Sequence, residues 1–220
     1  MADCGLRAAA QPNSQDGSVA QLSALHFPQT VRVKISNTQS AASSSTTREL
    51  PFESYVAGVV AAEGSVEEQL EALKAQAVAS RTFALHNPGR HAREGFDYCS
   101  TTHCQRFWWP EKLRNAVRQA VEQTVGEVLL DAQGHLADSY FHAACGGQTA
   151  NLESLWGQRA PVHLRGVRDD FCENRPNRHW QTELPVTQLA AALHREPRTD
   201  VGTSLQRIEI VKRDESGRAQ

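Results

Sequence analysis

The chain has 220 residues and a mass of 24.2 kDa, and its 23 Lys and Arg against 25 Asp and Glu give a formal net charge of −2 at pH 7. This near balance gives no general electrostatic case for binding nucleic acid or an anionic membrane. The composition, 40% hydrophobic and 22% charged, is typical of a globular protein. The sequence has no transmembrane-length apolar run, no signal peptide, and too few cysteines for a disulfide scaffold.

Residues 1–28 are rich in Ala, Gln, Ser and Gly without periodicity, which predicts a loose tail, and we expect residues 29–220 to form a folded domain. Alternating apolar and basic residues at 31–35 predict a half-buried strand, and the polar stretch 37–48 predicts a loop. Residues 205–212 predict a strand that is followed by a turn without a second strand. Because an unpaired terminal strand is poorly supported, we expect the domain to be truncated at its C-terminus.

Helical spacing of apolar residues predicts two helices in the first half of the chain. The first begins at Pro51, where a backbone N–H is not needed, and ends at Gly64. The second begins after a capping box formed by Ser65 and Glu68 and stops at Asn87.

Weaker patterns predict the remaining elements. In chain order they are a helix from Pro110 to Gly126, strands at 128–130 and 136–142 joined as a hairpin, loops over 151–180, and a short helix at 186–194. Helices that come early and mostly antiparallel strands that come later predict the α+β class, with a substrate cleft between the two parts.

The segment 87–110 has no periodic pattern but holds two His and two Cys. A stretch of this length without a regular element is unusual inside a compact domain and indicates function or a metal. Two thiolates and two imidazoles suit tetrahedral zinc, while a disulfide or free thiols are the alternatives, and Cys145 is a further candidate ligand. The four candidate zinc ligands are His91, Cys99, His103 and Cys104.

The stretch Tyr55–Leu85, YVAGVVAAEGSVEEQLEALKAQAVASRTFAL, closely resembles the stage II sporulation protein D family of peptidoglycan lytic transglycosylases. Three further motifs follow in the family's order: Cys99–Gln105 (CSTTHCQ), Gly146–Thr149 (GGQT), and Leu155–Gly157 (LWG) leading to Val167–Asp169 (VRD). The sequence departs from the family at Gly64-Ser65, where Met-Pro usually follows the key glutamate. Some members of the resembled family carry zinc at the loop that corresponds to residues 99–104.

The resemblance implies an enzyme that cleaves the bond between N-acetylmuramic acid and N-acetylglucosamine and leaves 1,6-anhydro-muramoyl ends. Such an enzyme uses one carboxyl group, first as a general acid and then as a general base, and the motif assigns this role to Glu63. A carboxyl group serves this role best when it is poorly solvated. The alternative is that Glu63 is an ordinary exposed residue at a helix end.

The resemblance also implies side chains that hold the hydroxyl, acetamido and carboxylate groups of the glycan. Lys74 and Arg81 are seven residues apart and should share one face of the second helix, whereas Gln76 points elsewhere. The structural alternative for Lys74 and Arg81 is ordinary surface charge or, for Arg81, bonds to loop carbonyls. The alternative for the double-glycine turn is a structural turn capped by its threonine. The candidate substrate-binding residues are Lys74, Gln76, Arg81, His142, Gln148 and Thr149.

Two other functions remain open. Because the family also includes amidase enhancers, the chain is alternatively a non-catalytic glycan-binding module that enhances a cell-wall amidase. A cysteine hydrolase that uses Cys104 and a histidine is the third reading. The expected partners are peptidoglycan glycan strands and other cell-wall hydrolases, with no nucleic acid and no cofactor besides zinc. The substrate implies a place in the cell envelope, on the extracellular side of the cytoplasmic membrane.

Overall fold

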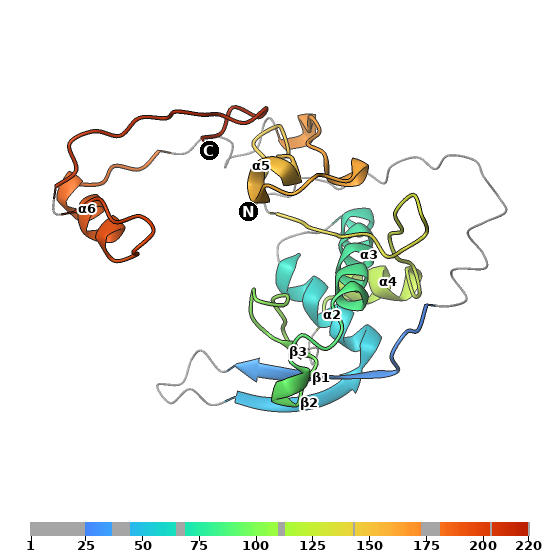
Figure 1. The fold of residues 1–220 in the computed structure, drawn as a ribbon. Helices are drawn as coiled ribbons and strands as arrows, with labels where there is room; N and C mark the ends of the chain where they lie inside the picture. Colours follow the sequence, from blue (N-terminus) through green and yellow to red (C-terminus); the bar gives the residue numbers. More distant parts are fainter. Residues whose placement is uncertain are drawn as a thin grey trace. The chain divides into compact units, whose positions relative to one another are not determined.

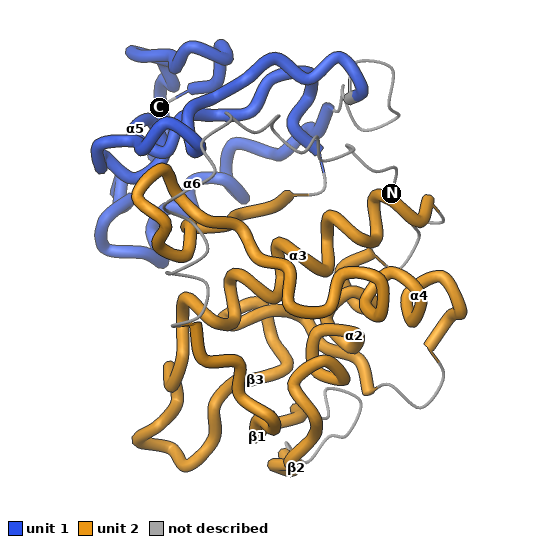
Figure 2. Tube along the Cα trace, turned by 90° about the vertical axis from the view of Figure 1, so that its right-hand side faces the viewer, with its two compact units in different colours: residues 1, 144–220 blue, residues 2–143 orange. Residues whose placement is uncertain are grey.

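Figure 1 shows the fold of the chain as a computed structural model. The chain divides into two compact units, unit 2 (residues 2–143) and unit 1 (residues 144–220), coloured separately in Figure 2. The predicted domain of residues 29–220 extends over both units and stays a prediction. The structure describes residues 25–36, 45–64, 69–109, 113–142, 144–172, 181–202 and 204–219.

Unit 2 contains a three-stranded mixed sheet in the order β2-β1-β3 (Figure 1). The central strand β1 (Thr30–Ser36) pairs antiparallel with β2 (Ser45–Pro51) and parallel with the short β3 (Tyr98–Cys99). Val31 and Val33 are buried while their neighbours along the strand are exposed or half-buried. The predicted half-buried strand is therefore confirmed.

The polar residues 45–48 belong to β2, so the prediction that they lie in a loop is wrong. All side chains of β2 except Leu50 are exposed, and the strand lies at the edge of the sheet. An edge strand with one buried side chain has no apolar alternation to reveal it.

The helix α2 (Phe52–Glu63) confirms the first predicted helix, with Pro51 just before it and Gly64 just after it. The second, α3 (Leu70–His86), ends at Asn87 as predicted. The side-chain amide of Asn87 donates to the carbonyl of Phe83 at 2.9 Å, which satisfies an acceptor in the last turn. The predicted capping box, Ser65 and Glu68, lies outside the described residues.

The core of unit 2 forms around α2, which contacts β1, β2, α3 and α4 (Asn115–Gln123) (Figure 1). A helix covered on several sides needs apolar residues around most of its circumference rather than along one stripe. Tyr55 of α2 stacks on Tyr98 of β3, with ring centroids 4.7 Å apart, and on Phe107, 5.7 Å away. The buried apolar residues of α2 include Phe52, Tyr55, Val56, Val59 and Val60.

Gly58 of α2 is in close contact with Phe107 and Trp108. A Cβ at this position would lie 2.3 Å from the Phe107 ring and 2.6 Å from the carbonyl oxygen of Trp108. We expect Gly58→Ala to lower the free energy of unfolding by about 1–3 kcal/mol, because overpacking outweighs the better helix propensity of alanine. Denaturant unfolding measures the change, and an unchanged midpoint would contradict the close approach.

The third predicted helix is confirmed over α4, where Val117, Ala120 and Val121 are buried, while Pro110 lies outside the described residues. The predicted hairpin strands at 128–130 and 136–142 are wrong. Leu130 and Leu136 form only an isolated antiparallel bridge. The turn between them is closed by the Asp131 carboxylate, which accepts from the backbone N–H groups of Gln133 and His135 at 2.9 Å each.

Unit 1 has short elements: α5 (Leu152–Trp156), the 3₁₀ turns η3 (Val162–Leu164) and η4 (Asp170–Cys172), and α6 (Val186–His194). The helix α6 confirms the short helix predicted at 186–194. Residues 205–212 form no regular strand, contrary to the prediction. Ile208, Ile210 and Val211 expose at least half of their surface, so this alternating segment has no apolar surface to pack on among the described residues.

Within the described residues, five α-helices and the mixed sheet confirm the α+β class. The predicted cleft stays a prediction. None of the helices in this part of the chain has the length and hydropathy needed to cross a membrane.

Candidate functional site

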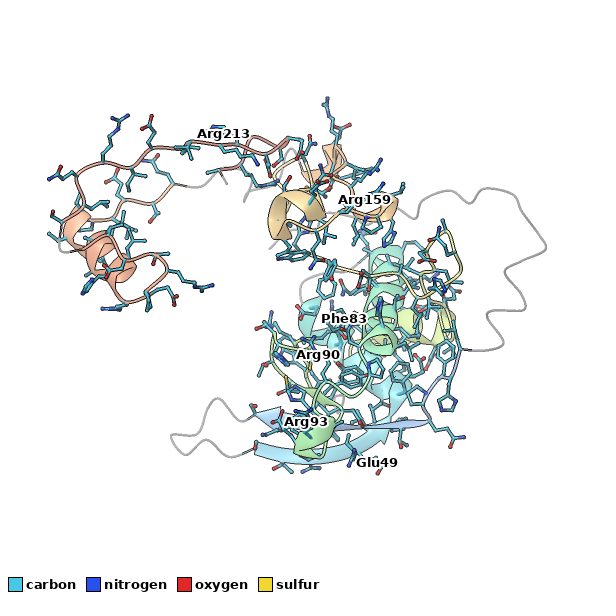
Figure 3. All side chains as sticks on the ribbon, viewed as in Figure 1. Glu49, Phe83, Arg90, Arg93, Arg159 and Arg213 are labelled. Atoms are coloured by element: carbon cyan, nitrogen blue, oxygen red, sulfur yellow. The ribbon has the colours of Figure 1, made fainter. Side chains whose placement is uncertain are left out.

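The segment between α3 and α4 is anchored to the rest of unit 2 at several points. The Arg90 guanidinium lies 5.8 Å from the ring centroid of Phe83 on α3 (Figure 3). At the sheet, the Asp97 carboxylate accepts from the backbone N–H of Arg32 at 2.7 Å, and the backbone N–H of Ser100 donates to the carbonyl of Lys34 at 3.0 Å. These bonds extend the β1–β3 pairing and fix the chain on both sides of β3.

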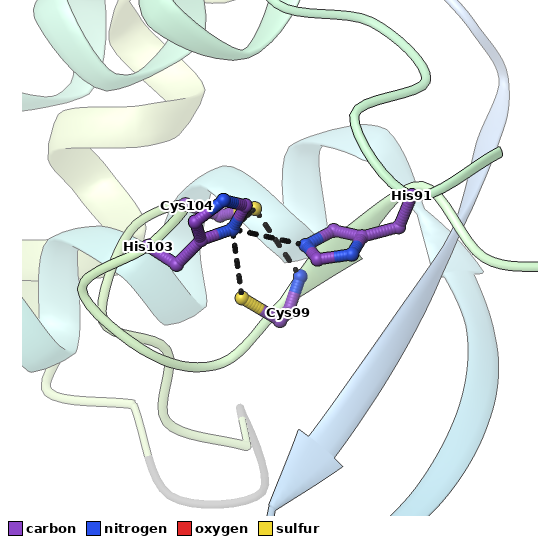
Figure 4. Close-up of side chains that lie close together, drawn as sticks. All are labelled: His91, Cys99, His103 and Cys104. Atoms are coloured by element: carbon purple, nitrogen blue, oxygen red, sulfur yellow. Dashed lines mark hydrogen bonds between the residues drawn. The ribbon is translucent and has the colours of Figure 1, made fainter. Parts of the chain in front are cut away.

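The structure brings the four predicted metal ligands together in one cluster (Figure 4). The ligand atoms of His91, Cys99, His103 and Cys104 all lie within 4.8 Å of one another. His103 Nδ1 lies 3.1 Å from His91 Nε2, 3.9 Å from Cys99 Sγ and 3.8 Å from Cys104 Sγ. Both thiols are free, with no disulfide between them. This donor set is chemically suited to a tetrahedral zinc ion.

The two thiols of the cluster have different acidities. Burial raises the pKa of Cys99, but hydrogen bonds from the side chain and backbone of Thr101 and from the His103 ring outweigh it and lower the pKa to about 6. Burial raises the pKa of Cys104 to about 11. Cys99 is therefore largely a thiolate at neutral pH, which is the form that binds metals.

The predicted catalytic residue, Glu63, is half-buried at the last position of α2. Its Oε1 accepts a hydrogen bond from the backbone N–H of Arg106 at 2.8 Å. Arg106 follows Cys104 by two residues, so the segment that carries the cluster also holds the Glu63 carboxylate. The Glu63 side chain is therefore neither fully exposed, as expected for an ordinary residue at a helix end, nor fully buried.

The residues around Arg106 are fixed against α2. Gln105 is buried, and its Oε1 accepts from the Tyr55 hydroxyl at 3.4 Å, while its Nε2 has no partner within the described part of the chain. Three residues after Gln105, the backbone N–H of Trp108 donates to the carbonyl of Gly58 at 3.1 Å. The N–H that reaches Glu63 is therefore held between two contacts with the same helix.

The candidate substrate residues on α3 lie in different environments. Lys74 is partly exposed and pairs with Glu71 at 2.7 Å, and Gln76 donates to Ser80 Oγ at 3.0 Å. Arg81, which was expected to share a helix face with Lys74, is fully buried.

The Arg81 guanidinium is engaged within the core of unit 2. It donates to both carboxylate oxygens of Glu53, at 2.9 and 2.7 Å, and to the carbonyl of Glu127 at 3.0 Å. These bonds join α2, α3 and the segment after α4. The burial favours the structural alternative for Arg81 over a contact with substrate.

The other substrate candidates do not all lie in one unit. His142 is exposed near the end of unit 2, whereas Gln148 and Thr149 lie in unit 1. Gln148 forms an isolated bridge with Arg168, and Thr149 Oγ1 accepts from the backbone N–H of Val167 at 2.8 Å. The Thr149 hydroxyl thus stabilises the turn region locally, while substrate contacts at these three residues stay a prediction.

The Cys145 thiol, the further candidate ligand, lies outside the cluster. It is buried in unit 1 and donates to Asp169 Oδ2 at 3.2 Å. Burial raises the pKa of this thiol.

Sequence reasoning missed two groups that complete the site. Arg106 acts through its backbone N–H, which leaves no signal in the identity of its side chain. Glu94 bonds His91 Nδ1 at 2.5 Å, and its spacing of three residues from a candidate ligand is a signal that could have revealed it.

Part of the chain is similar to a known protein family. Residues 40–130 match the family model SpoIID, described as stage II sporulation protein, and this range contains Glu63 and the whole cluster. The resemblance seen in the sequence is confirmed, since this region matches the family model.

Among individual relatives, the chain is 38% identical over 142 residues to an uncharacterized protein of Brachyspira hyodysenteriae, a match that covers 64% of this chain and 38% of that protein. It is 32% identical to the stage II sporulation protein D of Bacillus amyloliquefaciens and of Bacillus subtilis, and each match covers 58% of this chain and 41% of the relative. The chain thus spans about two fifths of the length of the curated relatives it matches.

Proposed function

We propose that the chain carries a peptidoglycan lytic transglycosylase domain, in which Glu63 cleaves the bond between N-acetylmuramic acid and N-acetylglucosamine. The match of residues 40–130 to the stage II sporulation protein family supports the proposal, because the resemblance implies a cell-wall enzyme. The observation that carries the proposal is the hydrogen bond from the Arg106 N–H to Glu63 Oε1, because it fixes one half-buried carboxyl group in a defined orientation.

The hydrogen bond assigns different roles to the two oxygens of Glu63. Oε1 accepts the Arg106 N–H, so the acidic proton resides on Oε2 in the protonated form. Oε2 protonates the glycosidic oxygen as the bond to the muramoyl C1 breaks. The C6 hydroxyl of the same sugar then attacks C1, and its proton returns to the Glu63 carboxylate. No water is consumed, and the carboxyl group ends in its starting state.

A hydrolase would need a second carboxylate to activate water or act as nucleophile. Glu53, the other acidic residue of α2, is not available for this role because both of its oxygens bond Arg81. One positioned carboxyl group is what the intramolecular reaction requires.

The products distinguish the proposed enzyme from its alternatives. Purified glycan strands incubated with the protein should give anhydro-muramoyl ends by mass spectrometry, and Glu63→Gln should give none. Reducing ends would instead indicate hydrolysis. If neither protein gives products but both bind glycan strands and stimulate a cell-wall amidase, the chain is an amidase-enhancing module. The substrate places the proposed activity in the cell envelope, where other wall hydrolases are its expected partners.

We also propose that His91, Cys99, His103 and Cys104 hold a zinc ion. The two sulfur and two nitrogen donors fit the preferences of zinc. When bound, the ion supplies a cross-link within the loop that precedes Arg106. Its expected contribution is structural, because all four protein ligands close a tetrahedral site.

Metal analysis tests the zinc proposal. We expect about one zinc per chain, as for other four-ligand structural sites, and a loss of most of it in Cys99→Ser. Cys145→Ser is the matched control, because it removes a buried thiol that lies in unit 1 outside the cluster. Equal zinc in Cys99→Ser and the wild type, or none in the wild type, would contradict the proposal.

A further inference from the structure

A carboxylate lies directly behind one histidine of the cluster. Glu94 Oε1 is 2.5 Å from His91 Nδ1, while the other ring nitrogen, Nε2, is 3.1 Å from His103 Nδ1. The two nitrogens of His91 therefore face different partners, an acceptor on one side and the cluster on the other (Figure 4 shows the cluster side).

The local fold sets this arrangement. His91 directly precedes the 3₁₀ turn η1 (Ala92–Glu94), and Glu94 is its last residue, whose backbone N–H donates to the carbonyl of His91 at 2.9 Å. The turn brings the Glu94 side chain back to His91. On the other side, the His91 ring stacks on Phe96, with centroids 4.4 Å apart. The stacking fixes the plane of the ring, and the carboxylate fixes its rotation within that plane.

We infer that Glu94 is a positioning residue for the metal site, which holds His91 with its proton on Nδ1 and its Nε2 lone pair directed at the metal. An ionised carboxylate only accepts hydrogen bonds, so the proton between the two groups belongs to Nδ1. The arrangement is that of carboxylate–histidine–metal sites, in which the carboxylate selects the tautomer and raises the basicity of the ligand.

The inference rests on the proposed zinc site, so its test begins with zinc affinity. Competition with a chelator should show about 10- to 100-fold weaker zinc binding in Glu94→Gln than in the wild type. Glu122→Gln, at an exposed position of α4, is the matched control and should bind zinc like the wild type. Equal affinity in Glu94→Gln and the wild type would overturn the inference while leaving the zinc site intact.

The tautomer of His91 gives a second readout that needs no metal. In the metal-free protein, at a pH where the ring is neutral, nitrogen NMR should show the proton on Nδ1 in the wild type and a mixture of tautomers in Glu94→Gln. A proton on Nε2 in the wild type would overturn the inference even if zinc binds. If the wild type binds no zinc, the metal proposal fails separately from the tautomer result.

Discussion

Glu63→Gln is expected to lower the rate of glycan cleavage by about 10²- to 10⁴-fold, the range typical for loss of a general acid–base group. Glutamine keeps the oxygen that accepts the Arg106 N–H but cannot donate and accept the proton in turn. The rate of formation of anhydro ends from purified glycan strands measures the effect.

The control for this variant separates chemistry from folding. Glu49→Gln changes an exposed glutamate of the edge strand β2 (labelled in Figure 3) and should leave the rate unchanged. Glu63→Gln should unfold at the same denaturant concentration as the wild type. Full activity of Glu63→Gln would remove the assignment of Glu63, whatever the fate of the zinc site.

The second large effect concerns stability. Glu53→Ala is expected to lower the free energy of unfolding by about 3 kcal/mol, because it leaves the fully buried Arg81 guanidinium without its carboxylate partner. The carbonyl of Glu127 would be its remaining described partner, and a neutral acceptor does not compensate a buried charge. Denaturant unfolding measures the loss.

Glu71→Ala is the matched control for Glu53→Ala. It breaks the ion pair with Lys74, in which the Glu71 side chain is 81% exposed, and should change stability by about 0–1 kcal/mol. Replacing both members of the buried pair, as in Glu53→Leu with Arg81→Met, should recover most of the loss because no unpaired charge remains. Equal effects of Glu53→Ala and Glu71→Ala would show that the Arg81 pair is not essential to the core.

The fold could be predicted from the sequence where burial leaves a periodic pattern. The helices α2, α3 and α6 were predicted within a few residues because apolar spacing and the flanking Pro51, Gly64 and Asn87 mark them. The edge strand β2 could not be predicted, since its pairing with β1 uses backbone groups that leave no trace in its polar side chains. The segment 205–212 has strand alternation but lacks a partner among the described residues.

The same contrast holds for the candidate site. Glu63 and the four His/Cys residues could be singled out because their side-chain types suit the proposed chemistry, and the structure brings the four His/Cys side chains together as expected. Arg81 looks like a binding residue in the sequence, yet its pairing with Glu53 links residues that are 28 positions apart and depends on how α2 packs on α3. Contacts of this kind come from tertiary packing, which a single sequence does not encode in any local pattern.

The fate of water at the cleaved bond tests the proposed reaction most directly. Glycan strands digested in isotopically labelled water should give muramoyl ends without the label, since the C6 hydroxyl rather than water attacks C1. Incorporation of the label at those ends would show that water is the nucleophile, and it would contradict a reaction carried by the single carboxyl group of Glu63.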